Sequence, residues 1–124
     1  MNLFAGWIAI LLGFVAGAVP GLFFAIEDWL GGYGSWRRRL VRLAHISFFG
    51  LGFINILLSL SVAHLGLDER APLLGWSSAL LVGGVIAMPT VCYLSAWRKP
   101  FRQLFFIPVT CMVLGVALFL SALM

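Results

Sequence analysis

The residue best placed for chemistry in this sequence is His45, an ionisable side chain in the segment of residues 36–61, which begins with a cluster of arginines and continues as an apolar run. On a helical plot at about 100° per residue, it shares one stripe with Gly52, Asn55 and Ser59. An imidazole or amide that faced lipid would leave costly unpaired donors and acceptors. The stripe is therefore expected to face other helices, a cofactor or a water-filled pocket.

A b-type haem is one cofactor that His45 could bind. The imidazole would be an axial ligand, and Arg42 and Arg38 would meet the propionates near the membrane interface. No second histidine lies at the same depth along the sequence. The sixth position would therefore need Met88, Met112, a water molecule or the same histidine of another copy.

A quinone site would need only one hydrogen bond from the same histidine and no second ligand. His45 would donate a hydrogen bond to a quinone carbonyl between the aromatic rings of Phe48 and Phe49. Asp28 could then relay protons. In a third interpretation, His45 is structural and binds a neighbouring helix or a backbone carbonyl that a proline has freed. All three roles stay open, so the cofactor (haem b, quinone or none) is unknown at this point.

The other reactive side chains form no catalytic or metal-binding set. His64 lies roughly 28 Å from His45 along one helix, at a rise of about 1.5 Å per residue, so the two cannot share a metal or a haem. Cys92 and Cys111 lie in separate apolar stretches and are expected to be packing residues. No metal site is predicted, and the lack of a triad or a pair of catalytic carboxylates disfavours an enzyme.

Composition places the chain among integral membrane proteins. Of its 124 residues, 63% are hydrophobic and only 10% are charged, which is outside the range of soluble domains. At roughly 20 apolar residues per crossing, there is room for four transmembrane helices and for no soluble domain. These helices are predicted at about residues 3–26, 43–67, 73–97 and 103–124. We therefore expect an all-α integral membrane protein, an antiparallel four-transmembrane-helix bundle in a single domain over residues 1–124.

Positive charges predict the orientation of these helices. All cations except Arg70 lie between the first and second or between the third and fourth predicted helix. By the positive-inside rule, that side is cytoplasmic, and both termini lie on the outer side of an inner, cytoplasmic-type membrane. The net charge of +4 then indicates anionic phospholipids as partners and does not favour nucleic acid. The residues expected at lipid head groups are Arg37, Arg38, Arg39, Arg98 and Lys99.

Small residues on the first predicted helix indicate close packing against another helix. Glycines expose the backbone, and small residues recur here at a spacing of four. Pro20 falls in the same helix and should kink it. The small residues of this ladder are Ala9, Gly13, Gly17 and Gly21. The last three, with the stripe residues Gly52, Asn55 and Ser59, are the predicted helix-packing positions.

The segment before the arginines holds Glu27 and Asp28 among glycines and aromatic residues. Its spacing fits neither a phosphate-binding loop nor a dinucleotide fingerprint. We expect both acids to form ion pairs with the arginines at the interface, and the aromatic residues to belong to the interfacial belt.

The two halves of the sequence also share a short echo. An Ala-x-Pro motif followed by tryptophan and two cations occurs at residues 18–20 and 36–38, and again at 87–89 and 97–99. The echo predicts a parallel duplication of a helical hairpin. Only the first half carries an imidazole, because His45 aligns near Phe105 or Phe106.

Two functions follow from these features. The first is a small non-catalytic subunit of a larger inner-membrane complex, respiratory or otherwise engaged in electron transport, that packs on other membrane subunits through the ladder and the stripe. Four short helices with one intramembrane histidine are similar in outline to the small membrane anchors of respiratory complexes. The alternative is a membrane electron carrier that binds quinone or b-type haem through His45.

Overall fold

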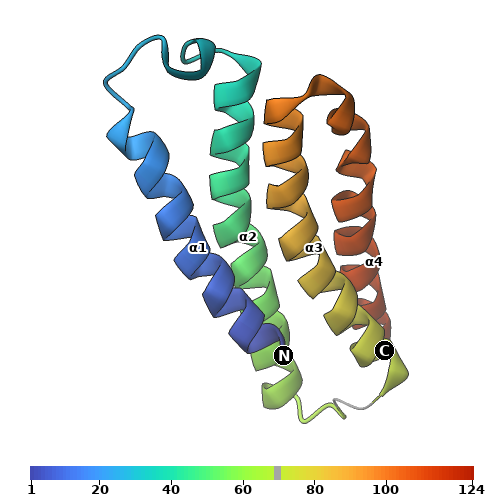
Figure 1. The fold of residues 1–124 in the computed structure, drawn as a ribbon. Coiled ribbons are helices and arrows are strands. Elements are labelled where there is room, and N and C mark those ends of the chain that lie inside the picture. Colours follow the sequence, from blue (N-terminus) through green and yellow to red (C-terminus); the bar gives the residue numbers. More distant parts are fainter. Residues whose placement is uncertain (69–70) are drawn as a thin grey trace.

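The computed structural model describes residues 1–68 and 71–124, and its secondary structure in that part is entirely helical. Four helices are long and apolar enough to cross a membrane. They are α1 (Asn2–Leu22), α2 (Trp36–His64), α3 (Pro72–Trp97) and α4 (Phe106–Ala122), as Figure 1 shows. Two short 3-10 helices, η1 (Trp29–Gly31) and η2 (Lys99–Phe105), lie in the connections. The fourth candidate span joins η2 to α4.

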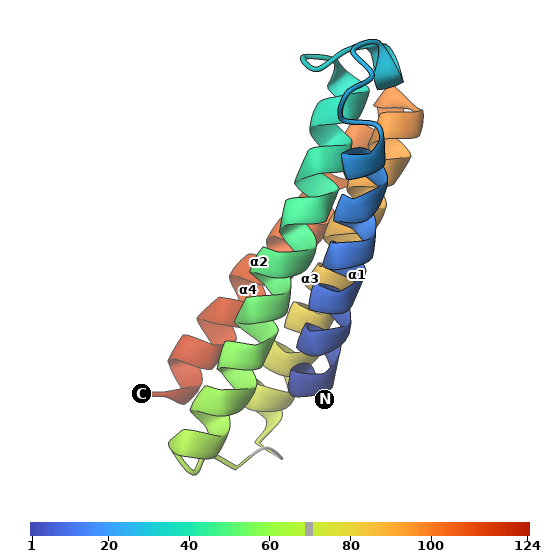
Figure 2. The same cartoon turned by 90° about the vertical axis from the view of Figure 1, so that its left-hand side faces the viewer.

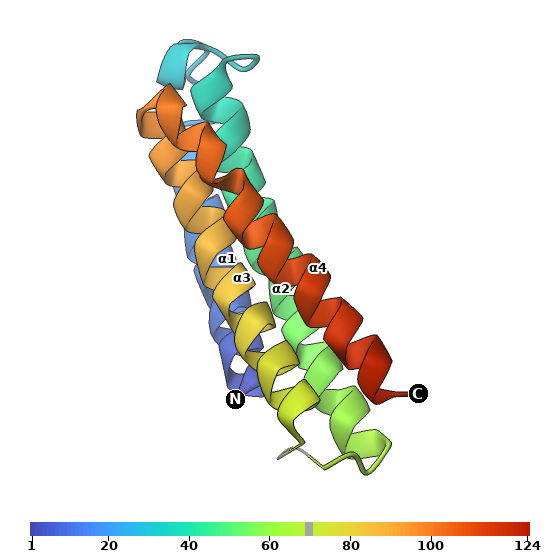
Figure 3. The ribbon, with the colours of Figure 1, turned by 90° about the vertical axis from the view of Figure 1, so that its right-hand side faces the viewer.

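The helices pack mainly in chain order. Close backbone contacts join α1 to α2, α2 to α3 and α3 to α4, with a smaller contact between α1 and α3. Within the described ranges, α4 makes no such contact with α1 or α2. Successive helices run in opposite directions, and both termini lie at one end (Figures 1, 2 and 3). The arrangement is therefore an open antiparallel array, because no contact between α1 and α4 closes it.

The cations gather at the end away from the termini. Arg37 lies in the first turn of α2, and Lys99 begins η2 directly after α3. Figure 1 shows both of these connections at the top, opposite N and C. The sequence-based assignment of all basic loops to one end of the molecule therefore agrees with the fold.

The second helix begins earlier than predicted, at Trp36 and not at residue 43. The prediction followed the apolar stretch, whereas arginines are good helix formers and extend the helix outward. Ser35 fixes the start, because its side chain accepts a hydrogen bond from the backbone N–H of Arg38 (3.2 Å). The basic cluster is thus the first turn of a helix and not a loop.

The first helix ends earlier than predicted, at Leu22 and not at residue 26. Pro20 lies close to this end, so the hydrogen bond that its missing N–H cannot make affects only the last turns of the helix. The last α-helix begins at Phe106, later than the predicted residue 103. Arg98 has an extended backbone (φ −137°, ψ 122°), and the chain then passes through η2 into α4 without a loop.

Close glycine contacts set the spacing of the helix pairs. A Cβ atom at Gly6 would lie 2.6 Å from the carbonyl oxygen of Gly52, so the backbones of α1 and α2 nearly touch there. A Cβ atom at Gly84 would lie 2.4 Å from the sulfur of Met112, and one at Gly115 would lie 2.8 Å from Leu81. Small residues therefore allow both the α1–α2 and the α3–α4 contacts.

The predicted duplication gains no support from the fold. Trp36 is the first residue of α2, whereas Trp97, its counterpart in the echo, is the last residue of α3. Pro20 lies near the end of α1, whereas Pro89 lies well inside α3. The two motifs therefore occupy different places in their hairpins.

Candidate functional site

His45 lies in the contact between α1 and α2. Its Nδ1 atom is 2.8 Å from the carbonyl oxygen of Gly13 on α1. A Cβ atom at Gly17 would lie 2.3 Å from the Cε1 atom of the ring, so only glycine leaves room for the imidazole. Phe49 packs edge-on against the same ring, with centroids 5.2 Å apart. The histidine therefore links two helices, half-buried, through a glycine notch.

This hydrogen bond determines what chemistry the imidazole can do. A carbonyl oxygen only accepts, so Nδ1 carries the proton, and in the neutral ring Nε2 has a free lone pair. Neutral His45 could therefore ligate a metal or accept a hydrogen bond through Nε2. It could donate to a quinone carbonyl only as an imidazolium. The predicted role as a donor to a quinone thus requires a charged ring, whereas a quinol hydroxyl would suit the neutral one.

Arg38 and Arg42, the predicted propionate partners, are engaged with the connection between α1 and α2. Arg38 is only 5% exposed, and its guanidinium donates to the backbone carbonyls of Phe24, Ile26 and Glu27 at 3.3–3.4 Å. Arg42 donates to the carbonyl of Tyr33 and stacks over its ring at 4.2 Å. Arg38 is thus turned inward to hold a loop.

Met112 on α4, one of the sulfur ligands considered for a haem, does not lie near His45. Met112 packs against Gly84 in the α3–α4 contact, whereas His45 lies between α1 and α2. Cys92 and Cys111 are free thiols. Across residues 1–68 and 71–124, no group of three or more histidine, cysteine or acidic residues could hold a metal ion.

A second polar centre joins three helices around Asn55, which is fully buried on α2. Its Nδ2 donates to the backbone carbonyls of Leu51 (3.0 Å) and Leu81 (3.2 Å). Its Oδ1 accepts from Nδ2 of Asn2 on α1 at 2.8 Å. Asn2 in turn accepts a hydrogen bond from the hydroxyl of Ser78 on α3. The three side chains Asn2, Asn55 and Ser78 form the asparagine cluster.

Sequence reasoning singled out Asn55 but missed the other two members of this cluster. The cluster is level with the first turn of α1, because Asn2 is the first residue of that helix. A polar residue at the start of an apolar helix and the Ser77–Ser78 pair on α3 were the available signals.

The remaining packing residues take different places. Gly13 and Gly52 lie at the α1–α2 contact together with Gly17, but a Cβ atom at Gly21 would meet nothing within 4 Å. Ser59 lines a small cavity of about 230 Å³ next to Asn2 and Ser78. Gly13 and Gly17 of the ladder thus pack against α2 of the same chain, whereas Gly21 packs against nothing in the structure.

The acids before α2 form no ion pair with the arginines, contrary to expectation. Glu27 and Asp28 are both exposed, and in the described part of the chain neither makes a salt bridge. Arg38 instead binds the backbone carbonyl of Glu27. A buried guanidinium gains more from fixed carbonyl dipoles than from mobile carboxylates in water.

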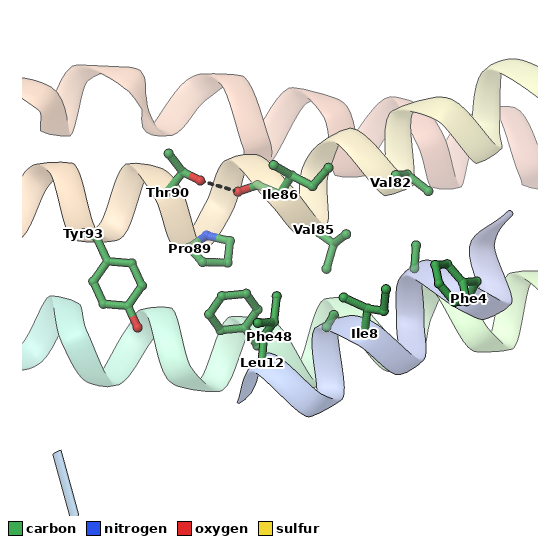
Figure 4. Close-up of a pocket in the computed structure, with 12 residues that line it drawn as sticks. Phe4, Ile8, Leu12, Phe48, Val82, Val85, Ile86, Pro89, Thr90 and Tyr93 are labelled. Atoms are coloured by element: carbon green, nitrogen blue, oxygen red, sulfur yellow. Dashed lines mark hydrogen bonds between the residues drawn. The ribbon is translucent and has the colours of Figure 1, made fainter. Parts of the chain in front are cut away.

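An apolar groove of about 430 Å³ lies between α1 and α3, with Phe48 of α2 on its inner side. Figure 4 shows apolar side chains from these helices lining it, with Phe4 near one end and Tyr93 at the other. The hydroxyl of Thr90 is used internally, since it donates to the carbonyl of Ile86 (2.7 Å). His45 does not line this groove.

Comparisons with protein-family models, with curated proteins and with solved structures found nothing that matches this chain.

Proposed function

We propose that this chain is a small non-catalytic subunit of a larger complex in an inner, cytoplasmic-type membrane, where it helps to assemble the membrane part. An electron-transport complex is the host that the similarity in outline to respiratory anchors favours. The chain would sit among other membrane subunits and anionic phospholipids, with both termini on the outer side.

The observation that supports this proposal is that polar side chains of the helices form hydrogen bonds with other helices of the same chain. His45 binds Gly13, Asn55 binds Asn2, and Ser77 binds the carbonyl of Gly115 on α4 at 2.7 Å. Of the buried side-chain polar atoms described, only the Ser95 hydroxyl lacks a partner. These groups hold the helices together, and of the two ring nitrogens of His45 only Nε2 is left for a ligand.

The surfaces left for partner subunits are the outer faces of the first and last helices. In α4 only Pro108 and Gly115 are buried. On α1, Trp7 and Phe14 are more than half exposed. Because the ladder and the stripe are used inside the chain, partner contact belongs on these apolar faces and not on the surfaces that the sequence suggested.

Affinity purification in a mild detergent, followed by mass spectrometry, tests the proposal. We expect the tagged chain to bring down the same few membrane proteins in stoichiometric amounts. Trp7→Ala or Val113→Ala should reduce their recovery, whereas Leu65→Ala, at an exposed helix end, should not. Recovery of the chain alone, with no partner in any mild detergent, would overturn the proposal.

A second candidate function is a haem-binding electron carrier, and one observation favours it. An Nδ1–H group that donates to a backbone carbonyl, with Nε2 left free, is the usual arrangement of a metal-ligating histidine. An absorption spectrum of the purified chain tests this. A Soret band that His45→Ala abolishes would support haem, and a featureless spectrum in protein expressed with excess haem would exclude it.

A further inference from the structure

Three cavities follow one another along one face of α3, which lies against α1, α2 and the connection between them. The apolar groove is lined by Phe48 of α2 and by Pro89 and Tyr93 of α3. Beyond it lie two cavities of about 400 and 380 Å³, both lined by Arg37, Ala96 and Trp97. We call the groove and these two cavities together the seam site.

Helical spacing shows that the cavities lie on one line. On α2, Arg37, Val41 and Phe48 are separated by whole numbers of turns and share one face. On α3, Pro89, Tyr93 and Trp97 recur every four residues. The α3 face that lines the groove therefore continues into the basic end, and α2 contributes Phe48 to the groove and Arg37 to the basic cavities.

The two ends of the seam site differ in chemistry. The groove is almost wholly apolar, with the Tyr93 hydroxyl at its end near the basic connections (Figure 4). The far end carries Arg37 and Lys99 beside two tryptophans, and no acidic side chain lines any of the three cavities. Such a site suits a ligand with an anionic head and an apolar tail.

The length of the groove matches one leaflet of a bilayer. From Val82 to Tyr93 on α3, the lining spans roughly 16 Å at the helical rise of about 1.5 Å per residue. Half of a hydrocarbon core that is about 30 Å thick is roughly 15 Å. An acyl chain of the basic-side leaflet would therefore fill the groove while its head group stayed at the interface.

The connection between α1 and α2 covers the basic end. Leu30 of η1 lines both basic cavities and has a positive φ of 55°, which is uncommon for leucine. The hydroxyl of Ser35 binds its carbonyl at 2.8 Å and helps to hold this conformation. The indole N–H of Trp36 binds the carbonyl of Ser95, which ties the start of α2 to α3 beneath the cavities. The basic end is thus held by specific contacts.

We propose that the seam site binds one anionic glycerophospholipid, with its phosphate between Arg37 and Lys99 and one acyl chain in the apolar groove. The inference rests on the membrane location in the proposed function, but it concerns the isolated chain and needs no partner subunit. The two cations and the two tryptophans that line the basic end favour a phosphate head group, and hence a phospholipid over a free fatty acid or a quinone.

Native mass spectrometry after reconstitution tests this site. The chain is reconstituted into vesicles of equimolar phosphatidylglycerol and phosphatidylcholine and then extracted into a mild detergent. The mass of the complex identifies the lipid that stays bound. We expect one retained phosphatidylglycerol. The pair Arg37→Gln and Lys99→Gln should lower its retention roughly tenfold or more. The matched pair Arg39→Gln and Arg102→Gln removes the same charge from exposed positions that do not line the cavities, and should leave retention unchanged.

A groove variant tests the position of the acyl chain. Ile86 lines the groove and is 63% exposed, so Ile86→Trp narrows the groove without touching the core. It should also lower retention while circular dichroism shows unchanged helix content. Equal retention in the two charge pairs, equal binding of phosphatidylcholine, or full retention in Ile86→Trp would each overturn the proposal. The lipid experiment uses the isolated chain, so its outcome does not depend on whether partner subunits are recovered in the purification experiment.

Discussion

The contact between His45 and Gly17 shows how the space left by a glycine positions another side chain. The imidazole fills the space that a Cβ atom at Gly17 would occupy, and this places Nδ1 within reach of the Gly13 carbonyl. The structural interpretation of His45 offered two partners, a neighbouring helix or a carbonyl freed by Pro20, and the acceptor is the Gly13 carbonyl of the neighbouring helix α1. Space, rather than a broken helix bond, decides where the imidazole lies.

A methyl group at Gly17 should therefore be costly. In Gly17→Ala the ring must move and lose its hydrogen bond, which we expect to destabilise the fold by about 1–3 kcal/mol. Gly21→Ala is the control, because a Cβ atom there meets nothing within 4 Å. Alanine should even favour the helix at that position by about 0.5 kcal/mol. Unfolding in detergent by denaturant measures both, and equal stabilities would show that the notch is not needed.

Substitution of Asn55 tests the asparagine cluster. Asn55→Leu removes the partner of Asn2 and should cost about 0.6–2 kcal/mol, the range found for hydrogen bonds between membrane helices. Asn55→Asp should cost considerably more, since a carboxylate would face the carbonyl oxygens of Leu51 and Leu81 in a buried site. The same unfolding assay measures both. An Asn55→Asp variant as stable as the native chain would contradict the burial of this amide.

At the scale of elements, the connection between α1 and α2 is ordered by the helix that follows it. Arg38 of α2 reaches back to three carbonyls of the connection and lies near the rings of Trp29 and Tyr33. Gly32 also has a backbone conformation (φ 93°, ψ 164°) that is essentially reserved for glycine. The segment is a compact cap held by one buried guanidinium.

Loss of this guanidinium should loosen the connection without unfolding the helices. Arg38→Ala is expected to increase chymotrypsin cleavage at the aromatic residues between 23 and 33 several-fold, because three carbonyls lose their donor. Arg39→Ala changes the same charge at an exposed position and should leave cleavage as in the native chain. Mass spectrometry of the fragments gives the readout. Similar cleavage of both variants would show that Arg38 does not hold the connection.

At the scale of the whole molecule, the open array leaves two helices with little covering. Of the other long helices in the described residues, only α3 makes close backbone contact with α4, and the exposed side of α1 is apolar and aromatic. A water-soluble protein would have to bury such surface, whereas a membrane or a partner subunit covers it at no cost. The outer face of α4 is where an additional helix of a partner would close the array.

The orientation of the molecule can be tested by cysteine labelling. In a background with Cys92→Ala and Cys111→Ala, Arg39→Cys should react with an impermeant maleimide only after the membrane is opened. Leu65→Cys, at the opposite end beyond α2, should react in intact cells, because the proposed orientation places the basic end in the cytoplasm. The reverse pattern would place the termini inside.

The sequence by itself predicted four long apolar helices and the end of the molecule at which most of its cations lie. Long apolar stretches have one stable form in lipid, the helix, and short loops fix the order and direction of the helices. It also singled out His45 and Asn55, because a polar group in an apolar stretch needs a partner wherever it lies.

Only the tertiary structure decided which partner each polar group has. Gly17 accommodates the imidazole, Asn2 pairs with Asn55, and Arg38 turns inward, because these contacts depend on the rotation and crossing of helices far apart in sequence. A periodic pattern gives the face of a helix but not the neighbour that meets it. The seam site likewise exists only once α2 and α3 bring Arg37 and Lys99 to one end of an apolar groove.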